Sequence, residues 1–224
     1  MTIELYAFPL SPRGFKVMAV ANHLGLDWKL RFVDLRKGEQ NKPEFAALNP
    51  NMRMPVLKDG DYVLWESSAI VQYLALRRPE AGLFPADERA RLDIARWQFW
   101  DHGHWDAPCS IFAFEYVVKP VVLGIGEPDP AEIAKGTERF HRAAKVLNEH
   151  LRGRRYITGP NLTVADFGIG SALNLAEMAH YPIEPYGEIK RWYAELAALP
   201  AWQRPSRNRR PPTPPLREAS RRVG

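Results

Sequence analysis

The 224-residue sequence has a single cysteine, Cys109. One cysteine excludes an internal disulfide framework, a Cys-x-x-Cys redox pair and a cysteine zinc site. The six histidines show no metal-ligand spacing such as His-Glu-x-x-His, and neither a Walker A motif nor a Gly-x-Gly-x-x-Gly turn is present. We therefore expect no bound metal and no nucleotide-dependent chemistry.

Long hydrophobic runs are also missing. No apolar stretch approaches the roughly 18 residues that a membrane-spanning helix needs, and the N-terminus, MTIELYAF, has no basic segment followed by an apolar core. We expect no membrane partner and a cytoplasmic, reducing compartment.

The positive charge is confined to the C-terminus. Residues 204–224 hold seven arginines and one glutamate, so they carry +6, and residues 1–203 carry −1 of the formal net charge of +5. A nearly neutral body lacks the basic stripe of a nucleic-acid-binding domain. The five prolines and few aliphatic residues of 204–224 predict a disordered, solvated tail, with contact to nucleic acid or an anionic membrane as the alternative.

The first third of the chain reads as a mixed α/β unit. A strand over residues 3–7 leads into a helix in which Ser11 is the N-cap and Pro12 takes the first helical position. Further strands are expected at 28–33, 55–57 and 62–64, the last two joined by a hairpin at Asp59-Gly60, with a second long helix capped by Ser67 and a short helix around 43–45.

Helical periodicity replaces this pattern after a Pro- and Gly-containing linker. Helices are expected over 88–118, 130–151, 163–179 and 186–199. Thr163 and Asp166 have capping-box spacing, which gives Asp166 a structural role, and the stretch 162–179 reads as a central buried helix. The predicted division is an α/β domain over 1–78, a linker over 79–87, an all-helical domain over 88–203 and the tail over 204–224.

Five motifs in this order resemble the cytosolic glutathione S-transferases. They are Tyr6-Ala7-Phe8-Pro9-Leu10-Ser11-Pro12-Arg13-Gly14, Gly38-Glu39-Gln40-Asn41-Lys42-Pro43-Glu44-Phe45, Asn49-Pro50-Asn51-Met52-Arg53-Met54-Pro55-Val56-Leu57, Trp65-Glu66-Ser67-Ser68-Ala69-Ile70 and Leu162-Thr163-Val164-Ala165-Asp166. The first turn is similar to the serine-using classes (theta, phi and bacterial relatives). The resemblance spans residues 1–203 and implies a thioredoxin-like βαβαββα domain followed by an all-helical domain.

The resemblance makes Ser11 the catalytic residue. Its hydroxyl would donate a hydrogen bond to the glutathione sulfur beside a helix N-terminus, and both influences favour the thiolate. From the residues alone, Ser11 is equally well a helix cap. Tyr6 is the rival donor but lies within a strand, where a core role is expected. Cys109 lies in the helical region as a small apolar filler or a cleft-wall residue.

The same resemblance assigns the glutathione contacts. Pro55 would follow a cis bond that turns the Met54 backbone toward the tripeptide. Glu66 and Ser67, at a helix start, would hold the γ-glutamyl end. Gln40, Lys42 and Arg53 are candidates for the glycyl carboxylate; many relatives have a histidine where this chain has Gln40, which leaves the choice among the three open.

An aromatic-rich segment is the candidate second-substrate site. Trp97, His104 and Trp105 belong to it, although a core or interface role is favoured for any one of them taken singly. The implied protein is a detoxifying enzyme that joins glutathione to a small apolar electrophile, acting as a homodimer. Disulfide or peroxide reduction, dehalogenation, ether cleavage and a non-catalytic binding module remain the alternatives.

Overall fold

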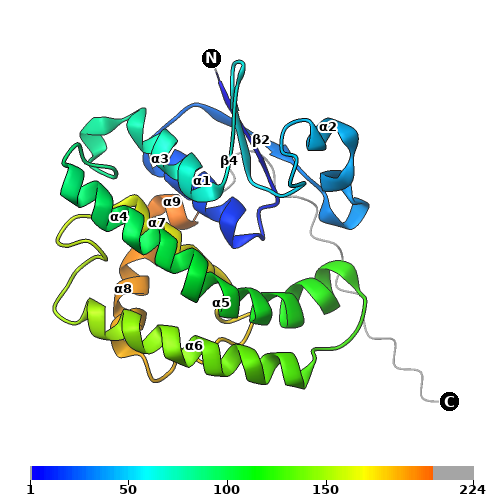
Figure 1. Ribbon diagram of the computed structural model, residues 1–224, viewed down its shortest axis with the longest axis vertical. Coiled ribbons are helices and arrows are strands. Elements are labelled where there is room, and N and C mark those ends of the chain that lie inside the picture. The colour runs from blue at the N-terminus through cyan, green and yellow to red at the C-terminus, as the bar shows by residue number, and fades with distance from the viewer. Residues whose placement is uncertain (1, 204–224) are drawn as a thin grey trace.

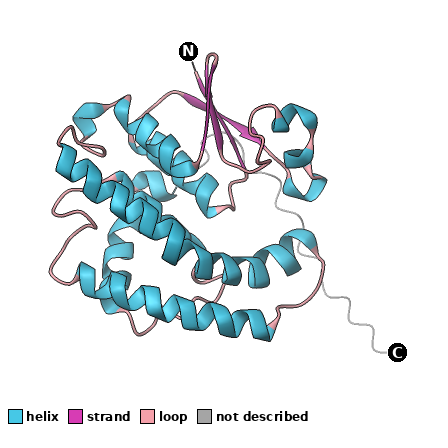
Figure 2. Ribbon diagram, viewed as in Figure 1, coloured by secondary structure: helices cyan, strands magenta, loops and turns pink. Residues whose placement is uncertain are grey.

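The computed structural model describes residues 2–203, so the predicted tail over 204–224 lies outside the described residues. A four-stranded sheet with the order β2-β1-β3-β4 forms one part, and helices form the rest (Figure 2). The strands are β1 (Ile3–Ala7), β2 (Trp28–Phe32), β3 (Val56–Asp59) and β4 (Tyr62–Trp65). Within residues 2–203, no helix is long and apolar enough to cross a membrane.

The sheet is mixed, as the βαβ and hairpin patterns predict. β1 and β2 run parallel with Ile3 opposite Trp28, while β3 pairs antiparallel with both β1 and β4. The helix α1 (Pro12–His23) is the crossover between the parallel strands. A parallel pair needs such a crossover, because its second strand must start at the same end as the first.

Two hydrophobic clusters cover the two faces of the sheet. α1 and α3 (Ser67–Leu76) lie on one side and the short α2 (Pro43–Ala46) on the other (Figure 1). Leu5 and Leu57 face the first cluster, and Val56 faces Phe45 of α2 in the second. This alternation follows from the two-residue period of a strand.

The remaining chain is helical. The helices are α4 (Glu88–Trp100), α5 (Asp106–Ala113), α6 (Pro130–Leu151), α7 (Val164–Gly170), α8 (Gly187–Ala197) and α9 (Pro200–Gln203). The segment predicted to be helical over 88–118 continues to Leu123, because π-helical turns at Asp101–Trp105 and Phe114–Leu123 follow α4 and α5 without a break. Short 3₁₀ turns occupy Leu35–Lys37, Glu39–Asn41 and Pro79–Ala81.

Two predicted helix ends are corrected by the structure. The expected helix 163–179 stops at Gly170 and tightens into a 3₁₀ turn, Ser171–Leu175. The Ser171 hydroxyl donates to the Gly168 carbonyl over 2.7 Å, a local bond that competes with the α-helical ladder. The predicted N-cap Ser67 is the first helical residue of α3, and Glu66 is the N-cap.

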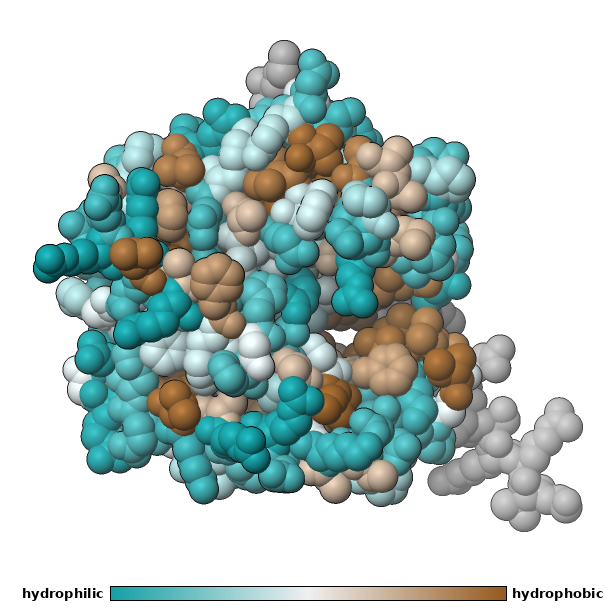
Figure 3. Space-filling model, in the orientation of Figure 1, coloured by the Kyte–Doolittle hydropathy of each residue, from teal (hydrophilic) through white to brown (hydrophobic). Residues whose placement is uncertain are grey.

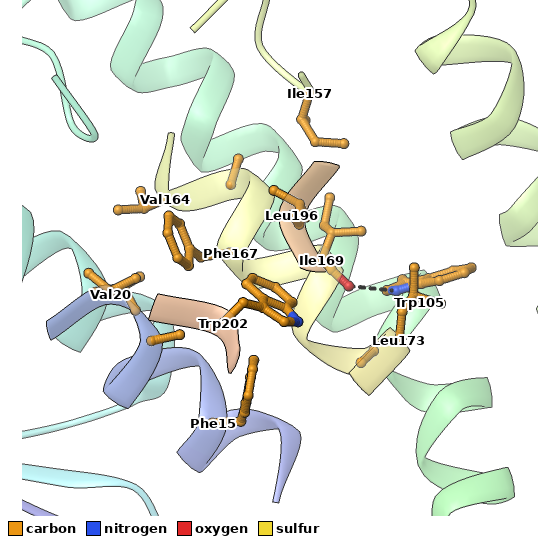
Figure 4. Close-up of a cluster of buried hydrophobic side chains, with 14 of the residues drawn as sticks. Phe15, Val20, Trp105, Ile157, Val164, Phe167, Ile169, Leu173, Leu196 and Trp202 are labelled. Atoms are coloured by element: carbon orange, nitrogen blue, oxygen red, sulfur yellow. Dashed lines mark hydrogen bonds between the residues drawn. The ribbon is translucent and has the colours of Figure 1, made fainter. Parts of the chain in front are cut away.

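The two parts of the molecule share one core. Phe15 of α1 packs edge-on against Trp202 of α9 with ring centroids 5.0 Å apart, and Trp202 in turn contacts Phe167 of α7. Figure 4 shows these three rings together, with the Trp105 indole N–H donating to the Ile169 carbonyl. The helices therefore fix α1 from the side opposite the sheet.

The predicted capping box is present and extends beyond its own helix. Asp166 accepts from the backbone N–H of Thr163 and of Ile157, and from the indole N–H of Trp192, at 2.8–3.0 Å. Burial raises the pKa of Asp166, although these donors oppose the rise. The carboxylate thus joins α7, α8 and the preceding loop, as its structural interpretation predicts.

Candidate functional site

The turn between β1 and α1 presents Ser11 at the start of a helix. The Ser11 hydroxyl caps α1 by accepting from the Gly14 N–H over 3.5 Å. A Cβ on Gly14 would lie 2.7 Å from the Phe8 carbonyl oxygen, so only glycine lets the first turn of α1 approach the chain leaving β1 this closely. Because a hydroxyl that accepts one bond still has its own proton, Ser11 is also a donor to any ligand beside it.

Ser11 borders a cavity of about 300 Å³, here called the apolar cavity. Figure 3 shows the molecular surface hollowed between the sheet domain and the helices, with hydrophobic side chains at the rim. Its walls come from the β1–α1 turn, α5, the π-helical segment after α5, and the 171–175 turn. They include Phe8, Leu10, Leu35, Cys109, Ala113, Phe114, Val117, Val118, Val122, Ala172, Leu175 and Tyr181, with Arg13, Asp106 and Ser110 as polar members.

A second cavity of about 190 Å³, here called the polar cavity, lies where α3 begins. Its lining consists of Arg13, Asn49, Arg53, Met54, Pro55, Glu66, Ser67 and His102. The Met54–Pro55 peptide bond is cis, as the resemblance implies. Asn49 fixes this loop, because its amide donates to the Arg53 carbonyl over 2.6 Å and its oxygen accepts from the Asn51 N–H.

The start of α3 has two features that are typical of a ligand-binding site. Glu66 has a φ of 70°, a strained conformation for a residue with a side chain, and such strain concentrates at functional sites. The Ser67 hydroxyl is buried and has no hydrogen-bond partner among residues 2–203. An unpartnered buried hydroxyl is unfavourable unless a ligand completes it. Together with the free N–H groups of a helix start, it fits a carboxylate.

Five of the predicted glutathione residues are brought together and two are not. Arg53, Met54, Pro55, Glu66 and Ser67 all line the polar cavity. Gln40 and Lys42 line neither cavity. Lys42 is exposed and pairs with Glu39 over 3.6 Å, and the Gln40 side-chain oxygen is buried without a partner in the described chain. Their assignment to the glycyl carboxylate stays a prediction.

The predicted second-substrate residues lie away from the apolar cavity. Trp105 is fully buried in the core, and Trp97 is buried against His150 with ring centroids 4.3 Å apart. His104 is exposed and packs beside the Trp100 ring. None of the three lines the apolar cavity.

The two other residues considered for thiol chemistry, Tyr6 and Cys109, are poorly suited to it. Tyr6 lies outside both cavities, and the Cys109 thiol is kept neutral by burial. Tyr6 lines neither cavity, and its hydroxyl donates to the Glu4 carboxylate over 3.2 Å. Cys109 is a wall residue of the apolar cavity, and burial raises the pKa of its thiol well above the usual value. A neutral buried thiol is a poor nucleophile.

Sequence reasoning assigned no glutathione contact to Arg13, His102 or Asp106. His102, from the turn after α4, contacts the Ser68 hydroxyl at 3.2 Å and reaches the polar cavity. Arg13 forms an ion pair with Asp106 of α5. Since these partners are 34 and 93 residues apart, no local spacing in the sequence marks either contact.

Beneath these groups lies a second, buried pair. The Lys16 ammonium is 3.7 Å from the Asp101 carboxylate, and both side chains are buried. Burial lowers the pKa of Lys16 and raises that of Asp101, while their mutual attraction opposes both shifts. Burial, together with the positive charges of Arg13 and Lys16, also lowers the pKa of His102.

Comparisons with known proteins identify the fold. A model of the glutathione S-transferase N-terminal domain matches residues 1–76, and one of the C-terminal domain matches residues 130–195. Glutathione S-transferase 3 from Zea mays is 36% identical over 210 residues, which are 90% of this chain and 92% of the relative. The chain belongs to the glutathione S-transferase family.

Solved structures agree with this membership. The structure of glutathione S-transferase III in apo form has a TM-score of 0.81 and 32% identity, covering 92% of this chain and 95% of that one. A glutathione transferase family member from Pseudomonas fluorescens, with two glutathione molecules bound, has a TM-score of 0.80 and 27% identity, covering 91% and 92%. This glutathione transferase is accordingly an enzyme of the transferase class, with glutathione as its thiol substrate.

The polar cavity fits that substrate. Its cis-proline backbone, the helix start at Ser67 and the exposed carboxylate of Glu66 offer groups for a peptide backbone, a carboxylate and an ammonium. Among residues 2–203, no group of three or more His, Cys, Asp or Glu side chains is placed to hold a metal ion.

Proposed function

We propose that glutathione lies in the polar cavity with its γ-glutamyl end at Glu66 and Ser67. The buried Ser67 hydroxyl and the α3 N-terminus bind the carboxylate, and Glu66 pairs with the ammonium. The Met54 backbone pairs with the cysteinyl residue, like one more strand at a sheet edge. Arg53 is the candidate for the glycyl carboxylate, because it lines this cavity and Gln40 and Lys42 do not.

Ser11 is the residue that ionises the thiol. A free thiol has a pKa of about 8.5, so at neutral pH only a few per cent is thiolate. A hydrogen bond donated by Ser11 and the positive end of α1 both stabilise the thiolate. The thiolate then attacks an electrophilic carbon. A C–S bond forms, the displaced electron pair leaves with the leaving group or moves onto a conjugated acceptor, and the thiol proton goes to solvent.

The second substrate is a small apolar electrophile in the apolar cavity. The observation that carries the proposal is that the two cavities meet at the α1 start: Ser11 and Arg13 line the apolar one, and Arg13 also lines the polar one. A cavity of about 300 Å³ lies at the lower end for drug-sized ligands. Its mainly aliphatic and aromatic wall favours uncharged substrates.

The ultraviolet thiolate band of bound glutathione, followed across pH, tests this function. We expect a bound-thiol pKa well below about 8.5 in the wild type and a return toward that value in Ser11→Ala. Tyr6→Phe is the matched control, and its titration should be unchanged. If Ser11→Ala titrates like the wild type, Ser11 loses its role. If glutathione does not bind, the proposed function is wrong.

Disulfide chemistry is the second candidate. The Pseudomonas fluorescens relative carries two glutathione molecules, as does a Burkholderia graminis transferase that is 25% identical, with a TM-score of 0.77 over 91% of this chain and 87% of that one. Arg13 and Ser110 give the apolar cavity polar groups for such a second molecule. Calorimetry separates the two cases: one glutathione per chain supports conjugation, and two support reduction of a glutathione mixed disulfide.

A cytoplasmic homodimer is the proposed assembly. Leu92 and Phe99 are 70% and 77% exposed and, seven residues apart, share one face of α4. Exposed apolar groups of this kind mark association surfaces. Sedimentation should give twice the chain mass for the wild type and a monomer for Phe99→Glu, with Val146→Glu as an exposed control on α6. Cell fractionation tests the compartment.

A further inference from the structure

Arg13 is the one described residue that lines both cavities. It occupies the second position of α1, two residues after Ser11, and its side chain is 32% exposed. The other polar residues of the polar cavity do not line the apolar cavity, and the remaining walls of the apolar cavity are mostly hydrophobic. Arg13 therefore lies at the boundary between the two cavities.

The reacting sulfur of glutathione must lie at this boundary. In the proposed function, on which this inference rests, glutathione fills the polar cavity and the electrophile fills the apolar one. The sulfur has to lie where the two meet, because it belongs to the first molecule and bonds to the second. The negative charge of the thiolate thus develops beside Arg13, where a cation stabilises it.

A residue of the helical domain holds the guanidinium in place. Nη2 of Arg13 is paired with Oδ2 of Asp106, and the Ser110 hydroxyl donates to the same oxygen over 3.2 Å. A guanidinium has five N–H donors in a fixed fork. Within residues 2–203 the guanidinium is paired through Nη2, which leaves Nε and Nη1 available to a ligand. Asp106 therefore orients the Arg13 guanidinium and partly offsets its positive charge, but leaves some of its N–H donors free.

We infer that Arg13 is a second thiolate-stabilising group alongside Ser11, with Asp106 as its positioning residue. Activation of glutathione then depends on both domains, since α1 supplies Arg13 and α5 supplies Asp106. The other charged or titratable groups of the neighbourhood are Lys16 on α1, Asp101 and His102 after α4, and Arg53 and Glu66 on the other walls of the polar cavity. The Lys16–Asp101 pair is buried, so Arg13 is the cation of α1 that a ligand can reach, while Arg53 on the opposite loop is already assigned to the glycyl carboxylate.

The competing explanation is an ion pair that only joins the domains. Loss of either partner would then have the same consequence, because each substitution breaks the same contact. A role in ionisation predicts opposite consequences for the bound thiol. Removing Arg13 removes a positive charge and should raise the thiol pKa, whereas removing the Asp106 charge should lower it.

The experiment is the pH titration of the thiolate band of bound glutathione in Arg13→Gln, Arg13→Lys and Asp106→Asn. We expect the thiol pKa to rise by about one unit in Arg13→Gln, to rise less in Arg13→Lys and to fall in Asp106→Asn. Arg155→Gln, which removes an exposed arginine paired with Glu195, is the matched control and should titrate like the wild type.

Shifts in the same direction for Arg13→Gln and Asp106→Asn, or no shift in either, would overturn the inference. If Arg13→Gln does not fold, the Asp106→Asn titration decides, because a lowered thiol pKa supports the inference and an unchanged or raised one refutes it. The two proposals fail differently. If the wild type binds no glutathione, the proposed function is wrong. If the thiol pKa rises in Ser11→Ala but is unchanged in Arg13→Gln, only this inference is wrong.

Discussion

Lys16 and Asp101 face each other across the boundary between the two domains, with Nζ 3.7 Å from Oδ2. Lys16 lies in the middle of α1 and Asp101 directly after α4, and their side chains are 1% and 5% exposed. Each ion is out of water, so each depends on the other. This pair joins α1 to the helical domain about one turn after the residues proposed to ionise glutathione.

We expect Lys16→Met or Asp101→Leu alone to lower the free energy of unfolding by about 3–5 kcal/mol, because each leaves an unpaired buried charge. The double variant should lose much less free energy of unfolding than the two single variants lose together. Urea unfolding of all four proteins measures the coupling. The exposed Lys190–Glu184 pair, 2.9 Å apart, is the comparison and should couple by less than about 1 kcal/mol. Additive losses at Lys16 and Asp101 would contradict this reasoning.

The stability of the protein should fall with acid partly through His102. Burial, and then Arg13 and Lys16, lower the pKa of His102 in the folded protein. The unfolded chain therefore takes up this proton first. The folded state is favoured fully above the unfolded pKa of about 6.5 and loses that advantage as pH falls through the folded value.

Unfolding of the wild type and His102→Gln at several pH values between neutrality and mild acid checks this. The variant should show a shallower loss of stability on acidification. The stability of the variant should still fall with acid, since burial also lowers the pKa of His23 and His150. Identical slopes for the two proteins would mean that His102 protonates as easily in the folded state as in the unfolded one.

The Ser67 hydroxyl should contribute to glutathione binding and not to the stability of the ligand-free protein. Its hydroxyl is buried and unpartnered in the described chain, so Ser67→Ala should leave the ligand-free protein as stable or slightly more stable. Loss of the hydrogen bond to the γ-glutamyl carboxylate should weaken glutathione binding about tenfold. The neighbour Ser68 bonds to His102 and does not line the polar cavity, so Ser68→Ala is the control, expected to bind nearly as the wild type. Equal affinity for Ser67→Ala would remove Ser67 from the site.

Asp166 should affect folding and leave the chemistry unchanged. Asp166→Ala leaves the Ile157 N–H and the Trp192 indole N–H buried without acceptors, and we expect a loss of about 3 kcal/mol or more. Trp192→Phe removes only one donor and should lose less through this network. Thermal unfolding measures the loss, and the thiol pKa of bound glutathione should be unchanged in any variant that folds. A shifted thiol pKa would contradict the purely structural role.

Local patterns predicted most of the elements. The alternation at 3–7, the Ser11-Pro12 helix start and the Asp59-Gly60 hairpin each depend on neighbouring residues, and each is where it was expected. The helix end at Gly170 was missed. A Cβ there would lie 2.5 Å from a Leu196 methyl, so that glycine is required by α8, a partner distant in sequence.

The candidate site divides in the same way. Ser11, Met54-Pro55 and Glu66-Ser67 belong to short motifs whose chemistry is local: a helix cap, a cis-proline turn and a helix start. The walls of the apolar cavity come from segments that lie far apart in the sequence, between Phe8 and Tyr181. Trp97, His104 and Trp105 do not line it, because composition alone cannot assign a side chain to a face.

The sequence by itself determined the mixed sheet, the helical second part, the serine at the first helix start and the place where the helix α3 begins. Each is specified within a few residues by periodicity, capping or turn chemistry. Only the tertiary structure decided that Arg13 meets Asp106 and that Lys16 meets Asp101. Those contacts exist because α1 packs against the helical domain, and side chains about 90 residues apart carry no mutual signal until packing brings them together.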